Sequence, residues 1–219
     1  MNFERVKGAA AGQNLDVIAA FHPSEGDLAP DGCATLVLLG PKEPGFWAAI
    51  SREPEARGPD PVDRWSRRII DALAEGLGAR ALFPFGGPPY QPFVNWALTS
   101  RQVWQSPVSL LVHDRAGLFV SFRGALAFDR RLDLPDITRR SPCESCASKP
   151  CLSACPPHAL TSQGYDLAAC HSFLDQPAGR SCLDAGCLVR KACPVSQIYG
   201  RLEQQSAHHM RYFHKKANS

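Results

Sequence analysis

Apolar and polar positions alternate along the chain in blocks that predict a mixed α and β fold. Two apolar stretches, residues 15–21 and 34–39, are rich in Val, Ile and Leu and are separated by turn-forming residues, a pattern typical of buried strands. The strongest helical pattern covers residues 61–77, because apolar side chains recur there at the spacing of one helix face and Gly78 follows at the end.

The next part of the chain predicts more β structure. Residues 79–85, 109–113 and 118–122 are apolar runs that we expect to join the same sheet as residues 34–39. The segment 114–117, Asp-Arg-Ala-Gly, has the composition of a hairpin turn between the last two runs. These elements predict an α+β domain in the N-terminal part of the protein.

Composition narrows the classes of protein to consider. The net charge of +3 is too small to favour nucleic acid as a partner. The apolar runs are much shorter than the roughly 18 residues that a membrane span needs, and the first residues lack the apolar stretch of a secretory signal. We therefore expect a cytoplasmic protein without a membrane segment, in which cysteines are metal ligands or catalysts more often than disulfides.

The cysteines are concentrated in one region, since eight of the nine lie between Cys143 and Cys193 while Cys33 stands apart. The first run, CESCASKPCLSACP, contains Cys143, Cys146, Cys151 and Cys155, followed by Pro156. Closely spaced thiolates allow one loop to wrap an iron–sulfur cubane, and the Cys-x3-Cys-Pro ending is typical of bacterial ferredoxins with two [4Fe-4S] clusters.

The second run has wider spacing but ends in the same way. It contains Cys170, Cys182, Cys187 and Cys193, followed by Pro194. In two-cluster ferredoxins the cysteine before proline ligates the other cluster. The same rule predicts a first set, Cys143, Cys146, Cys151 and Cys193, and a second set, Cys155, Cys170, Cys182 and Cys187, each holding one [4Fe-4S] cluster.

Zinc is the alternative metal, because four cysteines also form structural zinc sites. Zinc does not explain the repeated Cys-Pro ending, so we favour iron and sulfide. The domain prediction is then an α+β cofactor- or substrate-binding domain over residues 1–135, a ferredoxin-like module over 136–200 and a basic tail over 201–219.

The order of these features resembles a known group of proteins. A Cys-Pro-ended loop, a lone cysteine in AACHSFLDQ and a second Cys-Pro-ended run are similar to the iron–sulfur part of epoxyqueuosine reductases and of corrinoid reductive dehalogenases. The resemblance implies a nitroreductase-like α+β domain before the clusters, of the kind shared with cobalamin-processing chaperones. It also implies cobalamin as a second cofactor, reduced by the clusters.

An aromatic segment offers candidates for that cofactor's pocket. Tyr90, Phe93 and Trp96 follow a Gly-Gly-Pro-Pro turn, and aromatic rings beside a rigid loop suit a planar ring system. The alternative is that these residues belong to an aromatic core. The sequence leaves open whether cobalamin, flavin or neither binds there.

The leading hypothesis is an oxidoreductase whose two clusters carry electrons from a low-potential donor, such as a ferredoxin, a flavodoxin or a reductase. The electrons would reach a small-molecule cofactor or substrate in the N-terminal domain. The alternative is a non-catalytic ferredoxin-type carrier or a cobalamin-handling chaperone. A zinc-bearing RNA-binding module is a third class, suggested only by the basic tail.

Overall fold

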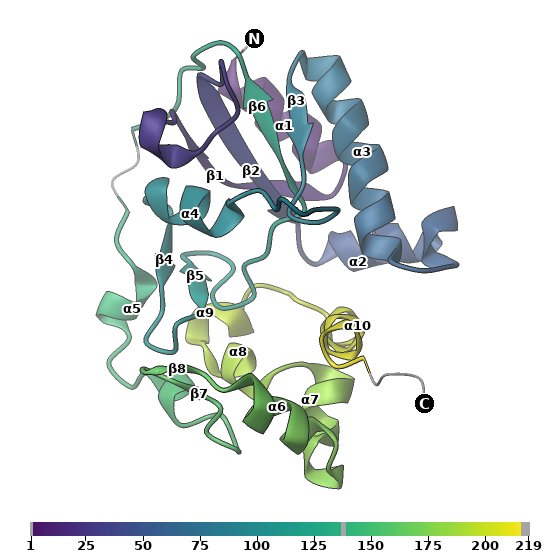
Figure 1. Ribbon diagram of the computed structural model, residues 1–219, viewed down its shortest axis with the longest axis vertical. Coiled ribbons are helices and arrows are strands. Elements are labelled where there is room, and N and C mark those ends of the chain that lie inside the picture. The colour runs from purple at the N-terminus through teal and green to yellow at the C-terminus, as the bar shows by residue number, and fades with distance from the viewer. Residues whose placement is uncertain (1, 137–138, 216–219) are drawn as a thin grey trace. The chain divides into compact units, whose positions relative to one another are not determined.

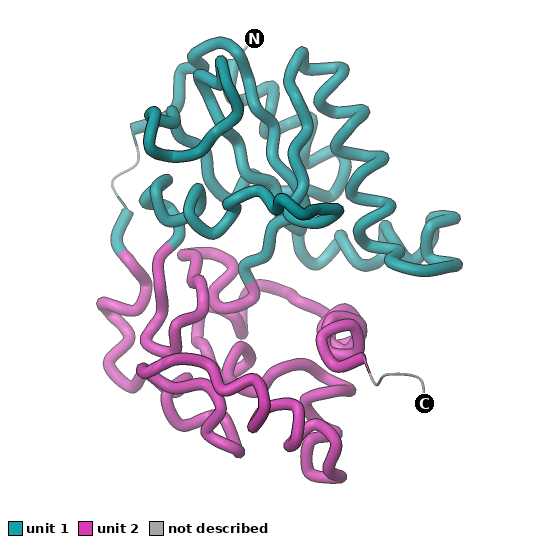
Figure 2. Tube along the Cα trace, viewed as in Figure 1, with its two compact units in different colours: residues 1–103, 120–140 teal, residues 104–119, 141–219 magenta. Residues whose placement is uncertain are grey.

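The computed structural model describes residues 2–136 and 139–215 and divides the chain into two compact units. Figure 2 colours the N-terminal unit, residues 1–103 and 120–140, and the C-terminal unit, residues 104–119 and 141–219. Helices and small sheets occur in both, so the predicted α+β class is confirmed. No helix among the described residues is long and apolar enough to cross a membrane.

The described residues of the N-terminal unit form four helices, two 3-10 turns and a sheet. In chain order its elements are α1 (Phe3–Gly12), β1 (Leu15–Phe21), η1 (Glu25–Asp27), β2 (Thr35–Pro41), α2 (Gly45–Arg52), η2 (Pro54–Ala56), α3 (Pro61–Leu77), β3 (Arg80–Leu82), α4 (Phe93–Thr99) and β6 (Gly124–Phe128).

The sheet of this unit has the strand order β1-β2-β6-β3, and all neighbouring strands are antiparallel. Val37 and Leu39 of β2 pack in one core with residues of α1, α2 and α3. Leu36 and Leu38 alternate onto the opposite face and are equally inaccessible to solvent. Figure 1 shows α1 behind the sheet and α4 in front of it, so this is a sheet covered on both faces.

The predicted helix over residues 61–77 is confirmed as α3. Val62 and Trp65 are buried on its inner face, and Gly78 ends the helix with the left-handed φ of 62° that a residue without Cβ adopts readily. A local pattern was sufficient here because both the amphipathic face and the end signal lie within the segment itself.

Two of the predicted strands are not part of this sheet. Residues 109–113 contribute a short strand to a separate two-stranded sheet, and residues 118–122 form no strand. The backbone of Leu118 is instead bonded to side chains, since its amide donates to Ser196 Oγ at 2.9 Å and its carbonyl accepts from Arg190. The backbone groups of a buried residue need hydrogen-bond partners, and for Leu118 side chains supply them.

The C-terminal unit consists of short elements joined by loops. They are β4 (Val103–Gln105), whose first residue belongs to the other unit, β5 (Leu111–His113), α5 (Pro142–Ser145), η3 (Pro150–Leu152), β7 (Leu160–Thr161), β8 (Gly164–Tyr165), α6 (Leu167–Leu174), η4 (Pro177–Gly179), α7 (Arg180–Ala185), α8 (Leu188–Ala192), α9 (Pro194–Gln197) and α10 (Glu203–Phe213).

The compact units differ from the predicted domain ranges in three respects, the first being that the N-terminal unit extends to residue 140 rather than 135. Residues 104–119, expected in the first domain, belong to the C-terminal unit. The segment expected as a basic tail contains α10, which packs against α7 and buries Gln205 completely. Residues 216–219 of that tail lie outside the described residues.

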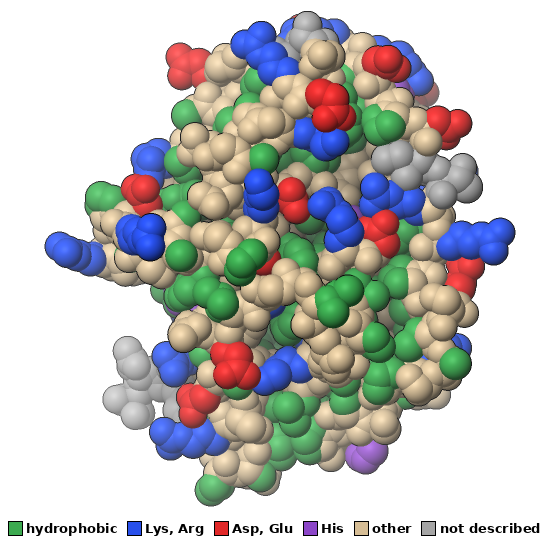
Figure 3. All heavy atoms as spheres, turned by 180° about the vertical axis from the view of Figure 1, so that it is seen from behind, with side chains coloured by type: hydrophobic (Ala, Val, Ile, Leu, Met, Phe, Trp, Pro, Cys, Tyr) green, Lys and Arg blue, Asp and Glu red, His purple; other side chains and the backbone are tan. Residues whose placement is uncertain are grey.

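Charges of both signs are interspersed on the face drawn in Figure 3. This distribution agrees with the small net charge of +3. On this face the arrangement resembles an ordinary solvated surface rather than a patch of one sign.

Candidate metal centre

The eight cysteines of the C-terminal unit gather into two groups of thiols. The thiol of Cys193 lies close enough to Cys143 and Cys151 to raise the pKa of both. The thiol of Cys155 has the same effect on Cys170 and Cys182. Cys193, which ends the second run in sequence, therefore lies with the first set. Cys155, which ends the first run, lies with the second set, so the two runs are crossed.

Short local structures hold the first set. Cys143 is in α5, whose first turn is capped by Ser141, and Cys146 is the C-terminal cap of the same helix. Cys151 lies in η3, and the chain reverses before it at Lys149, which has a left-handed φ of 38°. Cys193 joins them from the junction of α8 and α9. Three separate parts of the chain, α5, η3 and the junction of α8 and α9, thus bring their thiols to one place.

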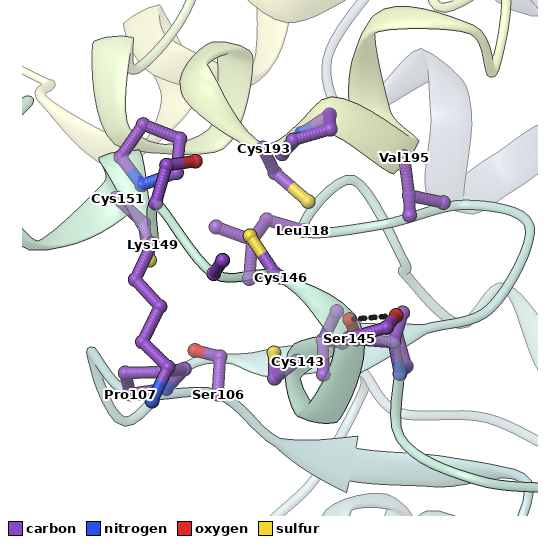
Figure 4. A pocket seen from close by; sticks show the side chains of 16 residues that line it. Ser106, Pro107, Leu118, Cys143, Ser145, Cys146, Lys149, Cys151, Cys193 and Val195 are labelled. Carbon is purple, nitrogen blue, oxygen red and sulfur yellow. Dashed lines mark hydrogen bonds between the residues drawn. The ribbon is translucent and has the colours of Figure 1, made fainter.

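The first set lines a cavity of about 430 Å³. In Figure 4 the sulfurs of Cys143, Cys146 and Cys193 point into the same space, with Leu118 and Val195 beside them. The walls around the thiols are mainly apolar, which lowers the local dielectric constant.

Electrostatics in this cavity disfavour free thiolates. Burial raises the pKa of Cys143 and Cys151, and the neighbouring thiols raise it further, while the Ser141 hydroxyl lowers that of Cys143. Several thiolates in an apolar cavity repel one another, so a multivalent cationic centre is the natural partner of the set.

The second set is carried by three helices and a loop. Cys170 lies in α6, Cys182 in α7, Cys187 caps the N-terminus of α8, and Cys155 follows η3. Burial raises the pKa of Cys170 and Cys182, and adjacent thiols add to the effect. The Tyr165 hydroxyl donates a hydrogen bond to Cys170 Sγ at 3.2 Å, which lowers the pKa of that thiol in part.

Both sets contribute thiols to one apolar core of the unit, which contains Cys151, Cys155 and Cys193 and, partly buried, Cys143, Cys170 and Cys187. Buried thiols pack there with Val108, Val112, Leu118, Ala159, Leu160 and Val189. Within residues 2–136 and 139–215, no three His, Cys, Asp or Glu side chains lie close enough to hold a single metal ion. In a cubane each cysteine binds a different iron, so the ligands are spaced around the cluster. Four thiols per group suit that donor requirement.

Gly117 brings an earlier part of the chain against this core. It has a φ of 56°, and a Cβ at this position would lie 2.5 Å from the backbone nitrogen of Ser196. Ser196 is three residues after Cys193 and receives the amide hydrogen of Leu118. The turn at Gly117 therefore sets where Leu118 meets the cavity of the first set.

The three aromatic candidates in the N-terminal unit have different surroundings. Trp96 is fully buried, and its Nε1 donates to the Asp27 carbonyl at 2.8 Å. Phe93 is also buried, with its ring centroid 5.0 Å from that of Trp96 and 6.0 Å from that of Phe122. Tyr90 is 66% exposed. Two of the candidates are thus core residues, and one faces solvent.

Sequence patterns did not single out Tyr165 or Arg190 as neighbours of the second set. Tyr165 reaches Cys170 because β7 and β8 form a tight hairpin, in which Leu160 pairs with Tyr165. No ligand-like spacing identifies such a contact. Arg190 offered one weak signal, since it lies three residues after Cys187 at the start of a helix.

Comparison with known proteins gives no match to a family model, to a curated protein or to a solved structure. The interpretation of the site therefore rests on the cysteine arrangement and on the geometry of the C-terminal unit.

Proposed function

We propose that this protein is an iron–sulfur electron-transfer protein in which the first set holds one [4Fe-4S] cluster and the second set holds another. The observation that supports this most is the crossing of the two cysteine runs, with Cys193 among the first set and Cys155 among the second. Crossed ligation is the arrangement of ferredoxin-like modules with two cubanes.

The protein's own residues would hold the ligands in place and exclude water. When bound, all-cysteine cubanes supply one-electron carriers of low potential. Leu118, Val112 and Val195 line the cavity of the first set and keep it apolar. The electron balance needs a reduced donor, such as a ferredoxin, a flavodoxin or a reductase, which loses one electron for each electron that the acceptor gains.

The first test is the metal content of protein purified without oxygen. We expect about eight iron and about eight acid-labile sulfide per chain, because each set supplies the four thiolates of one cubane. Colorimetric iron and sulfide assays with an absorption spectrum measure this directly. Zinc at one or two ions per chain, without sulfide or charge-transfer absorption, would disprove the proposal.

The acceptor is a second part of the proposal. By the resemblance, the N-terminal unit would be nitroreductase-like and would bind cobalamin or a substrate, making the protein an oxidoreductase. Tyr90 is the candidate contact that a ligand can reach without opening the core, since it is 66% exposed. The burial of Phe93 and Trp96 favours the alternative, a ferredoxin-type carrier or a cobalamin-handling chaperone, because those rings already serve the core.

Titration of the cluster-loaded protein with cob(II)alamin and, separately, with a flavin distinguishes the oxidoreductase from the ferredoxin-type carrier. If the oxidoreductase proposal is correct, one of these ligands binds, and Tyr90→Ala weakens its binding because a ring contact is lost, while Val94→Ala, an equally exposed change nearby, does not. Absorption changes during the titration report binding. Absence of binding for both ligands would leave the ferredoxin-type carrier as the function.

A further inference from the structure

The two sets of thiols differ in the polar groups that touch them, and the second set has the stronger contacts. Tyr165 donates its hydroxyl hydrogen to Cys170 Sγ at 3.2 Å. The β7–β8 hairpin fixes the tyrosine backbone, and its ring stacks on Phe213 with a centroid distance of 6.2 Å and an interplanar angle of 14°. The hairpin and the ring stacking together fix the position of the hydroxyl beside the sulfur.

The Tyr165 hydroxyl stays a hydrogen-bond donor at ordinary pH. A phenolic hydroxyl ordinarily loses its proton only at about pH 10, so it is a hydrogen-bond donor at neutral pH. A protonated phenol beside a thiolate sulfur stabilises negative charge on that sulfur.

Arg190 adds a positive charge to the same region. Its guanidinium is half-buried and donates to the carbonyl of Leu118. Burial lowers the pKa of Arg190, whereas the Cys187 thiol and the Tyr165 hydroxyl favour its charged form. A cation in low-dielectric surroundings acts more strongly on a neighbouring thiolate than a cation in water.

The first set has a hydroxyl and a lysine as its counterparts. The Ser141 hydroxyl and Lys149 lower the pKa of Cys143, but Lys149 is exposed and its charge is screened by solvent and salt. Hydrogen bonds to ligand sulfurs and nearby positive charge favour the more negative, reduced state of a cluster and so raise its reduction potential. The two sets therefore differ in the positive charge beside them, which is half-buried at Arg190 for the second set and exposed at Lys149 for the first.

We propose that Tyr165, through its hydrogen bond to Cys170, raises the reduction potential of a cluster held by the second set above that of a cluster held by the first set. This inference rests on the proposed iron–sulfur function. An electron delivered to the first set would then move to the second, which makes the second set the exit side of the protein. One electron leaves the first cluster for each one that the second gains, and the external donor is the reduced protein partner already named.

The experiment is a potentiometric titration of the cluster-loaded full chain, followed by electron paramagnetic resonance. The unmodified protein should show two transitions at different potentials. In Tyr165→Phe the higher of the two should shift to a more negative potential, while the other stays in place, because phenylalanine keeps the ring stacking and removes only the hydroxyl. Tyr212→Phe is the matched control, since that similarly exposed tyrosine contacts His208 and Lys215.

Two outcomes overturn the inference. The first is a full iron content in Tyr165→Phe with both transitions unmoved, and the second is a shift of the lower transition only. If Tyr165→Phe does not retain its iron, the unmodified sequence containing 3-fluorotyrosine gives the answer, since the more acidic phenol should move the higher transition to a more positive potential, and no movement refutes the role of the hydroxyl. Absence of iron and sulfide in the unmodified protein would instead refute the proposed function itself.

Discussion

Replacing Cys193 by serine should abolish the cluster of the first set and spare that of the second. Iron should fall from about eight to about four per chain, because one of two cubanes loses a thiolate ligand. The reason is the position of Cys193, whose thiol acts on Cys143 and Cys151 although it ends the second run in sequence. Iron and sulfide assays with electron paramagnetic resonance of the reduced protein measure the effect.

Matched variants identify which cluster remains. The signal left in Cys193→Ser should equal that left in Cys146→Ser and differ from that left in Cys182→Ser, since Cys146 belongs to the first set and Cys182 to the second. Cys33→Ser is the control for a cysteine substitution as such, because Cys33 lies in the N-terminal unit. If the spectrum of Cys193→Ser matched that of Cys182→Ser, ligation would follow the sequence runs and the crossed assignment would be wrong.

Trp96→Ala should destabilise the N-terminal unit by about 3–5 kcal/mol, the usual cost of removing a large buried aromatic side chain. The substitution leaves a cavity beside Phe93 and removes the donor to the Asp27 carbonyl. Urea unfolding of the full chain, followed by far-ultraviolet circular dichroism, measures the change in the free energy of unfolding.

The same helix offers the control for this prediction. Val94 lies in α4 two residues earlier and is 58% exposed, so Val94→Ala should change the free energy of unfolding by no more than about 0.5 kcal/mol. A Trp96→Ala protein as stable as Val94→Ala would show that the ring does not support the core. Weakened cofactor binding in such a stable variant would make Trp96 a pocket residue instead.

Elements with local signals were predictable from the sequence, and elements that depend on distant partners were not. The helix α3 carries its apolar face and its terminating glycine within the segment. The strand β6 was missed because GALAF is rich in glycine and alanine, which have low β propensity, and it is a strand through its pairing with β2 and β3.

In the candidate site, too, features with a local signal were predictable and features that depend on distant residues were not. The Cys-Pro endings predicted the grouping of thiols, because a short motif dictates where its own cysteine turns. The role of Leu118 was not predictable, since its amide is bonded to a hydroxyl 78 residues further along the chain. Its apolar run predicted a strand, whereas the structure uses the run as part of the wall around the first set.

The insertion of residues 104–119 into the C-terminal unit has a consequence for any attempt to isolate that unit. A fragment beginning at residue 136 would carry all eight clustered cysteines, yet it would lack Val112 and Leu118 from the cavity and the turn at Gly117. The polypeptide passes from one unit to the other at residues 103–104, 119–120 and 140–141, so no single proteolytic cut or cloning boundary separates them. During synthesis the inserted segment leaves the ribosome before the cysteines that it packs against. Its apolar side chains therefore stay exposed to solvent until residues 141–219 have been synthesised.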